Sequence, residues 1–139
     1  MKKKIILAFI IILFSGIGTG LYYYYKPVES LKNKKADITV SSEKLFNDFF
    51  VNEENANTIY LNKIVNVGGS ISDVGKNKDG SVTLTLSAGD AMGSVTCKME
   101  LDETAEADQL TKGTMVSING KCTGYLMDVV MVNCSLTKN

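Results

Sequence analysis

The sequence predicts a mainly β protein: a small closed barrel of five strands with an N-terminal amphipathic helix, preceded by a single transmembrane helix. Three observations predict this fold. An uncharged apolar run extends from Ile5 to Leu21. From residue 62 onward, short segments alternate apolar and polar residues, as strands with one buried face do. The first of these segments contains Gly68-Gly69, a pair typical of a bend or bulge.

Length and charge limit the classes of protein that the chain can belong to. Its 139 residues suffice for one domain of ordinary size. Lysines and acids balance overall, but Lys2, Lys3, Lys4 and Lys26 flank the apolar run, which leaves 11 lysines against 15 acids in residues 27–139, a net charge of −4. Arg and His are absent. This composition disfavours phosphate-backbone binding and removes the commonest general base and metal ligand.

Residues 1–26 are predicted to be a membrane anchor. As a helix, Ile5 to Tyr25 rises about 30 Å, the thickness of a bilayer core, and the four tyrosines at its end suit the headgroup level. Three lysines before the run and one after it predict a cytoplasmic N-terminus and an exported C-terminal domain (periplasmic or extracellular). Two alternatives remain: a signal peptide cleaved near Gly18-Thr19-Gly20, and a buried core helix. A lipoprotein would need a Cys just after the run, and none stands there.

The exported part is predicted to begin with a tether over residues 27–40, because this stretch is charged and lacks apolar periodicity. The domain proper is predicted over 41–139. Its first element is a helix over 42–57, since Ser41 and Ser42 suit an N-cap and Glu43 suits the first turn. Leu45, Phe46, Phe49 and Phe50 supply one apolar face.

Five strands are expected to follow, at about 62–73, 81–88, 93–100, 114–121 and 128–136. Asp79-Gly80 predicts a tight turn after the first. In the second, Val82, Leu84 and Leu86 share one face and should fill the barrel. The last two strands lie in KGTMVSINGKCTGYLMDVVMVNCSL and are joined at Gly-Tyr-Leu. In the fifth strand, Val130, Val132, Cys134 and Leu136 share one face and Val129 and Met131 the other, which makes this strand a candidate for cover on both sides.

Five short strands, a small insert between the third and fourth, and a glycine-bent first strand match the oligonucleotide/oligosaccharide-binding (OB) barrel. The chain resembles the bacterial tRNA-anti-like OB-fold family of small envelope proteins. The resemblance is carried by EENANTIYLNKIVNVGGSI, by VTCKM and above all by KGTMVSINGKCTGYLMDVVMVNCSL, together about residues 40–136. It implies a fold and brings no catalytic residues with it.

The candidate binding residues lie on the polar face of the second and third strands and in the loop after the fourth. They are Thr83, Thr85, Ser94, Thr96 and Tyr125. Hydroxyl groups on a barrel face suit a glycan or a peptide, although such a face is also an ordinary solvated exterior. Single-strand binding needs a basic groove and aromatic platforms. No aromatic residue stands in the five predicted strands, so nucleic acid is not the expected partner.

Cys97, Cys122 and Cys134 fall on inward-facing positions. Because three is an odd number, at most one disulfide can form. If the OB strand order holds, the third and fifth strands are parallel neighbours, which makes Cys97–Cys134 the possible disulfide. The alternative is three small buried apolar side chains. We expect no metal site, because the chain has no C-x-x-C pair and the acids from Asp102 to Asp108 lack the spacing of a Ca²⁺ loop.

The predicted function is a non-catalytic OB-fold binding or scaffolding module anchored in the bacterial membrane. We expect no cofactor; the expected partners are the membrane itself and an envelope protein or glycan. The first alternative is a single-stranded nucleic-acid-binding protein of the tRNA-anticodon type. The second is a thiol-dependent envelope protein that uses one of the three cysteines.

Overall fold

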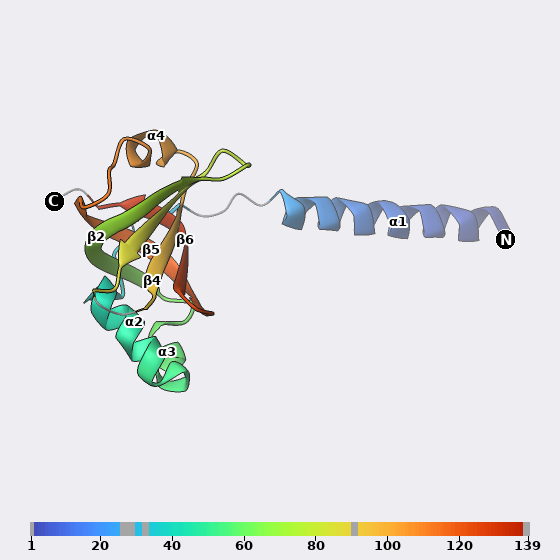
Figure 1. Cartoon of the computed structure of the whole chain (residues 1–139). Coiled ribbons are helices and arrows are strands. Elements are labelled where there is room, and N and C mark those ends of the chain that lie inside the picture. Colours follow the sequence, from blue (N-terminus) through green and yellow to red (C-terminus); the bar gives the residue numbers. More distant parts are fainter. Residues whose placement is uncertain (1, 26–29, 32–33, 90–91, 138–139) are drawn as a thin grey trace.

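The computed structural model describes residues 2–25, 30–31, 34–89 and 92–137, without the side chains of residues 2–10, 13 and 14. The first helix is α1 (Lys2–Tyr24). Over the described part of the chain, no helix combines the length and the hydropathy that crossing a membrane requires. The remaining elements form a barrel with helices at its two ends (Figure 1).

Five strands close the barrel. They are β2 (Ile64–Lys76), β3 (Val82–Ser87), β4 (Ser94–Met99), β5 (Met115–Tyr125) and β6 (Val129–Leu136). Their order is β2-β3-β4-β6-β5, and β5 pairs back onto β2. All neighbours are antiparallel except β4 and β6, which run parallel. The prediction of a mainly β fold with a closed five-stranded barrel is therefore confirmed.

The barrel closes because β2 pairs along different edges in its two halves. Residues up to Ser70 pair with β5, whereas residues from Ile71 pair with β3. Gly69 lies at this change of partner, and a Cβ there would stand 2.3 Å from Ser42 Oγ. A side chain would therefore collide with the start of the helix that covers the barrel, which explains the glycine. The inward set Val82, Leu84 and Leu86 is fully buried, as predicted.

A bulge in β6 changes which residues face the core. Val129 and Met131 are fully buried, whereas Val130 and Val132 are half-buried on the outside. Asn133 then adopts a left-handed conformation (φ 52°), and the pairing with β4 shifts between Cys97 and Met99. The extra residue turns Cys134 back into the core. Val129 and Met131 thus face the core before the bulge and Cys134 faces it after the bulge, whereas Val130 and Val132 do not.

The predicted tether over 27–40 is not a free spacer where the structure describes it. Residues Ile38–Ser41 form a strand, β1, that pairs in parallel with the first half of β2. Before it, Asp37 exchanges two hydrogen bonds with the backbone of Ile64. Lys34 O accepts a hydrogen bond from the Asn119 amide, and Leu31 is buried. We call residues 30–41 the strap. Residues 26–29 and 32–33 lie outside the described residues.

The single helix predicted over 42–57 is two helices, α2 (Ser42–Val51) and α3 (Glu53–Tyr60). Asn52 ends the first and caps the second, because its N–H donates to Asp48 O and its side chain accepts from Asn55 N–H. Leu45, Phe46 and Phe49 of α2 face the core as expected, whereas Phe50 is exposed. The pair covers one end of the barrel (Figure 1), and a short helix, α4 (Thr104–Ala107), lies at the other end.

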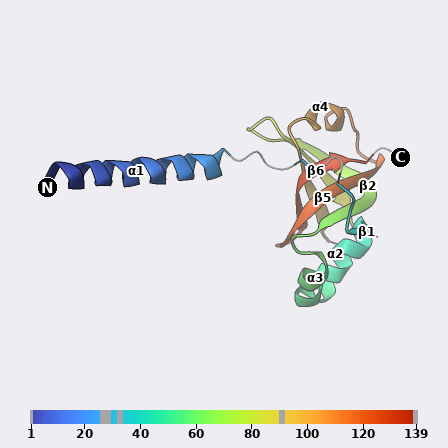
Figure 2. The ribbon, with the colours of Figure 1, turned by 180° about the vertical axis from the view of Figure 1, so that it is seen from behind.

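The view from behind shows the same arrangement (Figure 2). The hairpin between β2 and β3 lies on the side of the barrel next to the end of α1, and α2 and α3 lie at the end farther from it. The end of the barrel that carries the β2–β3 hairpin therefore lies closer to α1 than the end that carries α2 and α3.

Candidate functional site

The outer face of β3 and β4 carries the predicted hydroxyl residues. Thr83, Thr85, Ser94 and Thr96 are all half-buried there, and Thr85 pairs directly with Thr96. We call these four residues the hydroxyl face.

The members of the hydroxyl face differ in what already engages them. Ser94 is occupied, because its N–H and its Oγ both donate to Asp128 Oδ1, over 2.7 and 2.8 Å. The Thr83 hydroxyl accepts from the Asn77 amide over 2.8 Å. Within the described part of the chain, the Thr85 and Thr96 side chains have no hydrogen-bond partner. These two are therefore the members best placed to meet a ligand.

The sequence predicts Tyr125 in the loop between the last two strands, and the structure corrects this position. Tyr125 is the last residue of β5, and its ring packs against Phe46 and Phe49, with ring centroids 5.9 Å apart in each pair. The turn consists of Leu126, Met127 and Asp128 instead. Tyr125 is thus part of the packing between α2 and the barrel, although it stays half-buried and lines a groove of about 430 Å³ together with Glu53, Thr123 and Val130.

The three cysteines are buried free thiols. Burial raises the pKa of the Cys134 thiol well above its usual value, and a hydrogen bond with the Cys97 thiol raises it further. Burial also raises the pKa of Cys122. High pKa values oppose the thiolate form that nucleophilic attack requires. Cys97 and Cys134 lie on the neighbouring parallel strands β4 and β6. Both are free thiols in this structure, and the Cys97–Cys134 disulfide stays a prediction.

A groove of about 760 Å³ lies next to the hydroxyl face, where β4 ends beside the middle of β6 and near the start of the strap. We call it the strap groove. Its polar groups are Lys98, Asp79, Glu100, Asp102 and the left-handed Asn133, and its apolar lining includes Met99 and Val132. The sequence does not predict the strap groove. The bulge at Asn133 and the docked strap form its borders, and neither feature produces a periodic pattern in the sequence.

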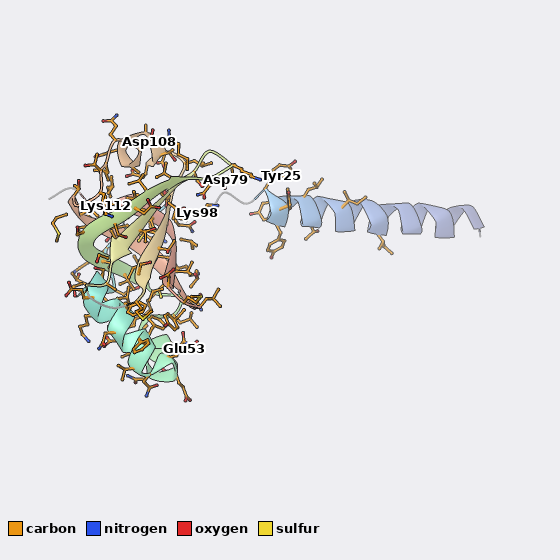
Figure 3. The ribbon with its side chains drawn as sticks, in the orientation of Figure 1. Tyr25, Glu53, Asp79, Lys98, Asp108 and Lys112 are labelled. Carbon is orange, nitrogen blue, oxygen red and sulfur yellow. The ribbon has the colours of Figure 1, made fainter. Side chains whose placement is uncertain are left out.

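One ion pair spans the strap groove. Lys98 Nζ lies 2.8 Å from Asp79 Oδ2, and both side chains are about half exposed. The hydrogen bond from Lys98 and those from Ser81 hold the pKa of the Asp79 carboxyl well below its usual range. Figure 3 places both residues on the side of the barrel that faces Tyr25 at the end of α1. Exposed pairs of this kind are weakly held and exchange readily for another partner.

The opposite end of the barrel, beside α2, exposes apolar side chains. Those at the helix and at the β5–β6 turn are Phe50, Val51, Leu126 and Met127, each more than two-thirds exposed. Phe50 stacks on the buried Phe46 ring. Among the described residues, no group of three or more cysteines and acids is close enough to hold a metal ion.

These features define the class of protein. Five strands in this order, closed through β2–β5 and entered by a glycine-bent first strand, form an OB barrel. Comparison with protein families gives the particular family: the tRNA_anti-like model matches residues 1–136, and the chain belongs to that family. No curated protein sequence matches the chain significantly.

Two solved structures share the fold. A Klebsiella pneumoniae protein assigned as a nucleic acid-binding lipoprotein aligns at a TM-score of 0.61 with 22% identity, over 72% of this chain and 91% of that one. A Leishmania major protein assigned as an aspartyl-tRNA synthetase aligns at a TM-score of 0.50 with 11% identity. The alignment covers 88% of this chain and 25% of the Leishmania major protein. At these identities the likeness concerns the fold.

Proposed function

We propose that the chain is a non-catalytic binding module of the bacterial envelope, held at the membrane by its N-terminal helix. The anchor is supported by the uncharged run from Ile5 to Leu21 and by the lysines that flank it. The lysine bias predicts that the barrel is exported. The Klebsiella pneumoniae neighbour is assigned as a lipoprotein, which agrees with a location of this chain at the envelope.

The observation that carries the binding role is the hydroxyl face. The unengaged Thr85 and Thr96 lie side by side on adjacent strands, on the surface that OB barrels use for their ligands. Hydroxyls without charges suit a neutral polar ligand, such as a glycan or the backbone of a peptide. Among the described residues, neither the Thr85 nor the Thr96 hydroxyl lies within hydrogen-bond distance of a base that could activate it, which supports binding without catalysis.

The proposal is tested by site-specific photo-crosslinking in the native cells. A photoreactive residue at Thr96 is expected to give a discrete adduct with an envelope protein or glycan. The same residue at Lys112, which precedes β5 and is not part of the hydroxyl face, is the matched control and should give none. Identical adduct patterns at the two sites, or none at Thr96, would refute the hydroxyl face as the binding surface. Alkaline extraction of the membranes tests the anchor separately.

Single-stranded nucleic acid is the second candidate, and the family name and the assignment of the Klebsiella pneumoniae neighbour favour it. The surface chemistry opposes it. Lys98 is the single basic residue of β3 and β4, and Asp79 already neutralises it. A thiol-dependent function is the third candidate, and it requires chemistry at a buried cysteine of raised pKa.

A further inference from the structure

The strap begins beside the strap groove. Ser30 Oγ donates to Glu100 Oε2 over 2.5 Å, and Leu31 N–H donates to Glu100 Oε1 over 2.8 Å. The Leu31 side chain is only 6% exposed, so packing also holds the chain at this point. The place where the chain reaches the barrel is therefore fixed, and Glu100 is also part of the groove lining.

Little chain separates this point from α1. The helix ends at Tyr24 and Ser30 is already docked. A fully extended chain advances at most about 3.3–3.6 Å per residue, so these six steps span at most about 20 Å. If α1 is the membrane anchor, this short connection keeps the strap groove close to the lipid headgroups. Figures 1 and 2 agree, since both show the β2–β3 hairpin on the α1 side.

The groove offers opposite charges on an apolar base. Lys98 supplies an ammonium group, and Glu100 and Asp102 supply carboxylates. Met99 and Val132 contribute carbon to the lining, and Leu101 stands 70% exposed at its edge. A polyanion would meet more acids than bases here. A ligand with its own cation and anion a few bonds apart, attached to an apolar tail, matches this set of groups.

Asn133 brings a side-chain amide to the groove. Its φ of 52° inside a strand marks the bulge, and asparagine adopts this left-handed conformation more readily than most residues that carry a side chain. The bulge places this residue, with its amide donors and acceptor, in the groove lining instead of in the ladder of β6. The volume of about 760 Å³ lies within the range of small-molecule sites.

We propose that the strap groove binds a zwitterionic phospholipid headgroup of the phosphoethanolamine type. Lys98 and the Asn133 amide meet the phosphate, with Lys98 exchanging Asp79 for it. Asp102 meets the ammonium group beside Glu100, whose two oxygens already accept hydrogen bonds from Ser30 and Leu31, and Leu101 contacts the glycerol and acyl region. The inference rests on the proposed membrane anchor. It adds that the barrel is oriented on the bilayer, with the strap groove toward the lipid.

The test uses the full chain in phosphatidylcholine nanodiscs that contain a lipid with a nitroxide headgroup. A fluorophore is placed on Leu101→Cys, and in a second sample on Leu126→Cys; the native cysteines are buried and do not react. Quenching is expected at position 101 and not at position 126. Equal quenching at the two positions would overturn the proposed orientation.

Headgroup choice is tested by adding phosphatidylethanolamine or phosphatidylglycerol as guest lipid. Phosphatidylethanolamine alone is expected to increase the quenching at position 101. Lys98→Gln and Asp102→Asn should each weaken this dependence about threefold, the effect of losing one partly exposed charge contact. Lys112→Gln is the control and should change nothing. A response to phosphatidylglycerol alone, or to neither lipid, would refute the site. Failure of the chain to enter nanodiscs at all would refute the anchor instead.

Discussion

At the scale of single residues, the contact between Gly69 and Ser42 joins the barrel to its covering helix. Ser42 is buried, and its Oγ donates to Ser87 O over 2.6 Å. A Cβ on Gly69 would stand 2.3 Å from that Oγ and 2.9 Å from the Ser42 Cβ. The neighbouring Gly68 has much more space, because its nearest atom is Val116 O at 4.0 Å.

Gly69→Ala is therefore expected to lower the free energy of unfolding by about 1–3 kcal/mol, the usual penalty for overpacking. Gly68→Ala is the matched control and should be neutral or slightly stabilising, since alanine loses less backbone entropy on folding. Denaturant unfolding of the two variants measures the difference. Equal stabilities would show that the Ser42 side chain can move away from an added Cβ at position 69 at little cost in free energy.

Tyr60 makes the alkaline stability of the chain measurable. Burial and the hydrogen bond that its hydroxyl donates to Asp48 Oδ2, over 2.7 Å, raise the pKa of Tyr60 to about 12. An unfolded tyrosine titrates near 10. The protonated form is thus favoured by folding, so this contribution is complete below about pH 10 and is lost as the pH rises through about 12.

Tyr60→Phe should remove one late step from the ultraviolet titration of the tyrosines, and should flatten the fall in stability between pH 10 and 12. Tyr25→Phe is the control, because that side chain is exposed; its variant should keep the late step. A late step that survives in Tyr60→Phe would contradict the assignment.

Particular residues also show what a sequence can reveal about this fold. Val82, Leu84 and Leu86 alternate strictly, and all three are buried as predicted. Tyr125 was misplaced, because β5 continues past the expected end at 121 and helix α2 comes close enough to cover the ring. Asn133 gives no signal, since a bulge depends on the register of two partner strands. Local periodicity predicts burial within a strand, and tertiary contacts decide the ends and irregularities.

At the scale of elements, the strap and the helix pair are the parts that periodicity could not reveal. β1 has only four residues, which alternate apolar and polar side chains. It forms a strand because it pairs with the free edge of the first half of β2. The division between α2 and α3 depends on Asn52. Its backbone N–H still donates to Asp48 O of the first helix, while its side chain caps the second. One residue thus serves two helix ends.

Asn52→Ala is expected to destabilise the chain by about 1 kcal/mol, the usual loss for an N-cap side chain. The loss should concentrate in α3, because the α2 contact is made by the backbone and survives the change. Hydrogen exchange of the Asn55 backbone N–H, which donates to the Asn52 side chain, measures this local loss of stability directly. Asn57→Ala, within the same helix, is the control and should be neutral. Unchanged exchange at Asn55 would show that the cap contributes little.

At the scale of the whole molecule, charge distribution separates the two leading functions. Residues 27–139 carry a net charge of −4 and no Arg. The hydroxyl face adjoins a single lysine, which an acid already pairs. An OB barrel with this surface offers a nucleic acid neither a basic groove nor a stacking platform. The fold alone, shared with proteins of different roles, does not decide between the functions.

The full chain is therefore expected to bind single-stranded RNA weakly, with little dependence on salt. Each neutralised phosphate contributes about −0.7 to the slope of log affinity against log salt on single strands, and one contact through Lys98 gives a slope no steeper than about −1. Fluorescence anisotropy over a salt series measures it. Lys98→Gln should flatten the slope further, and Lys112→Gln should not. A slope steeper than about −3 would mean that several lysines outside β3 and β4 contact the phosphate backbone. Nucleic acid would then replace the glycan or peptide as the ligand of this barrel.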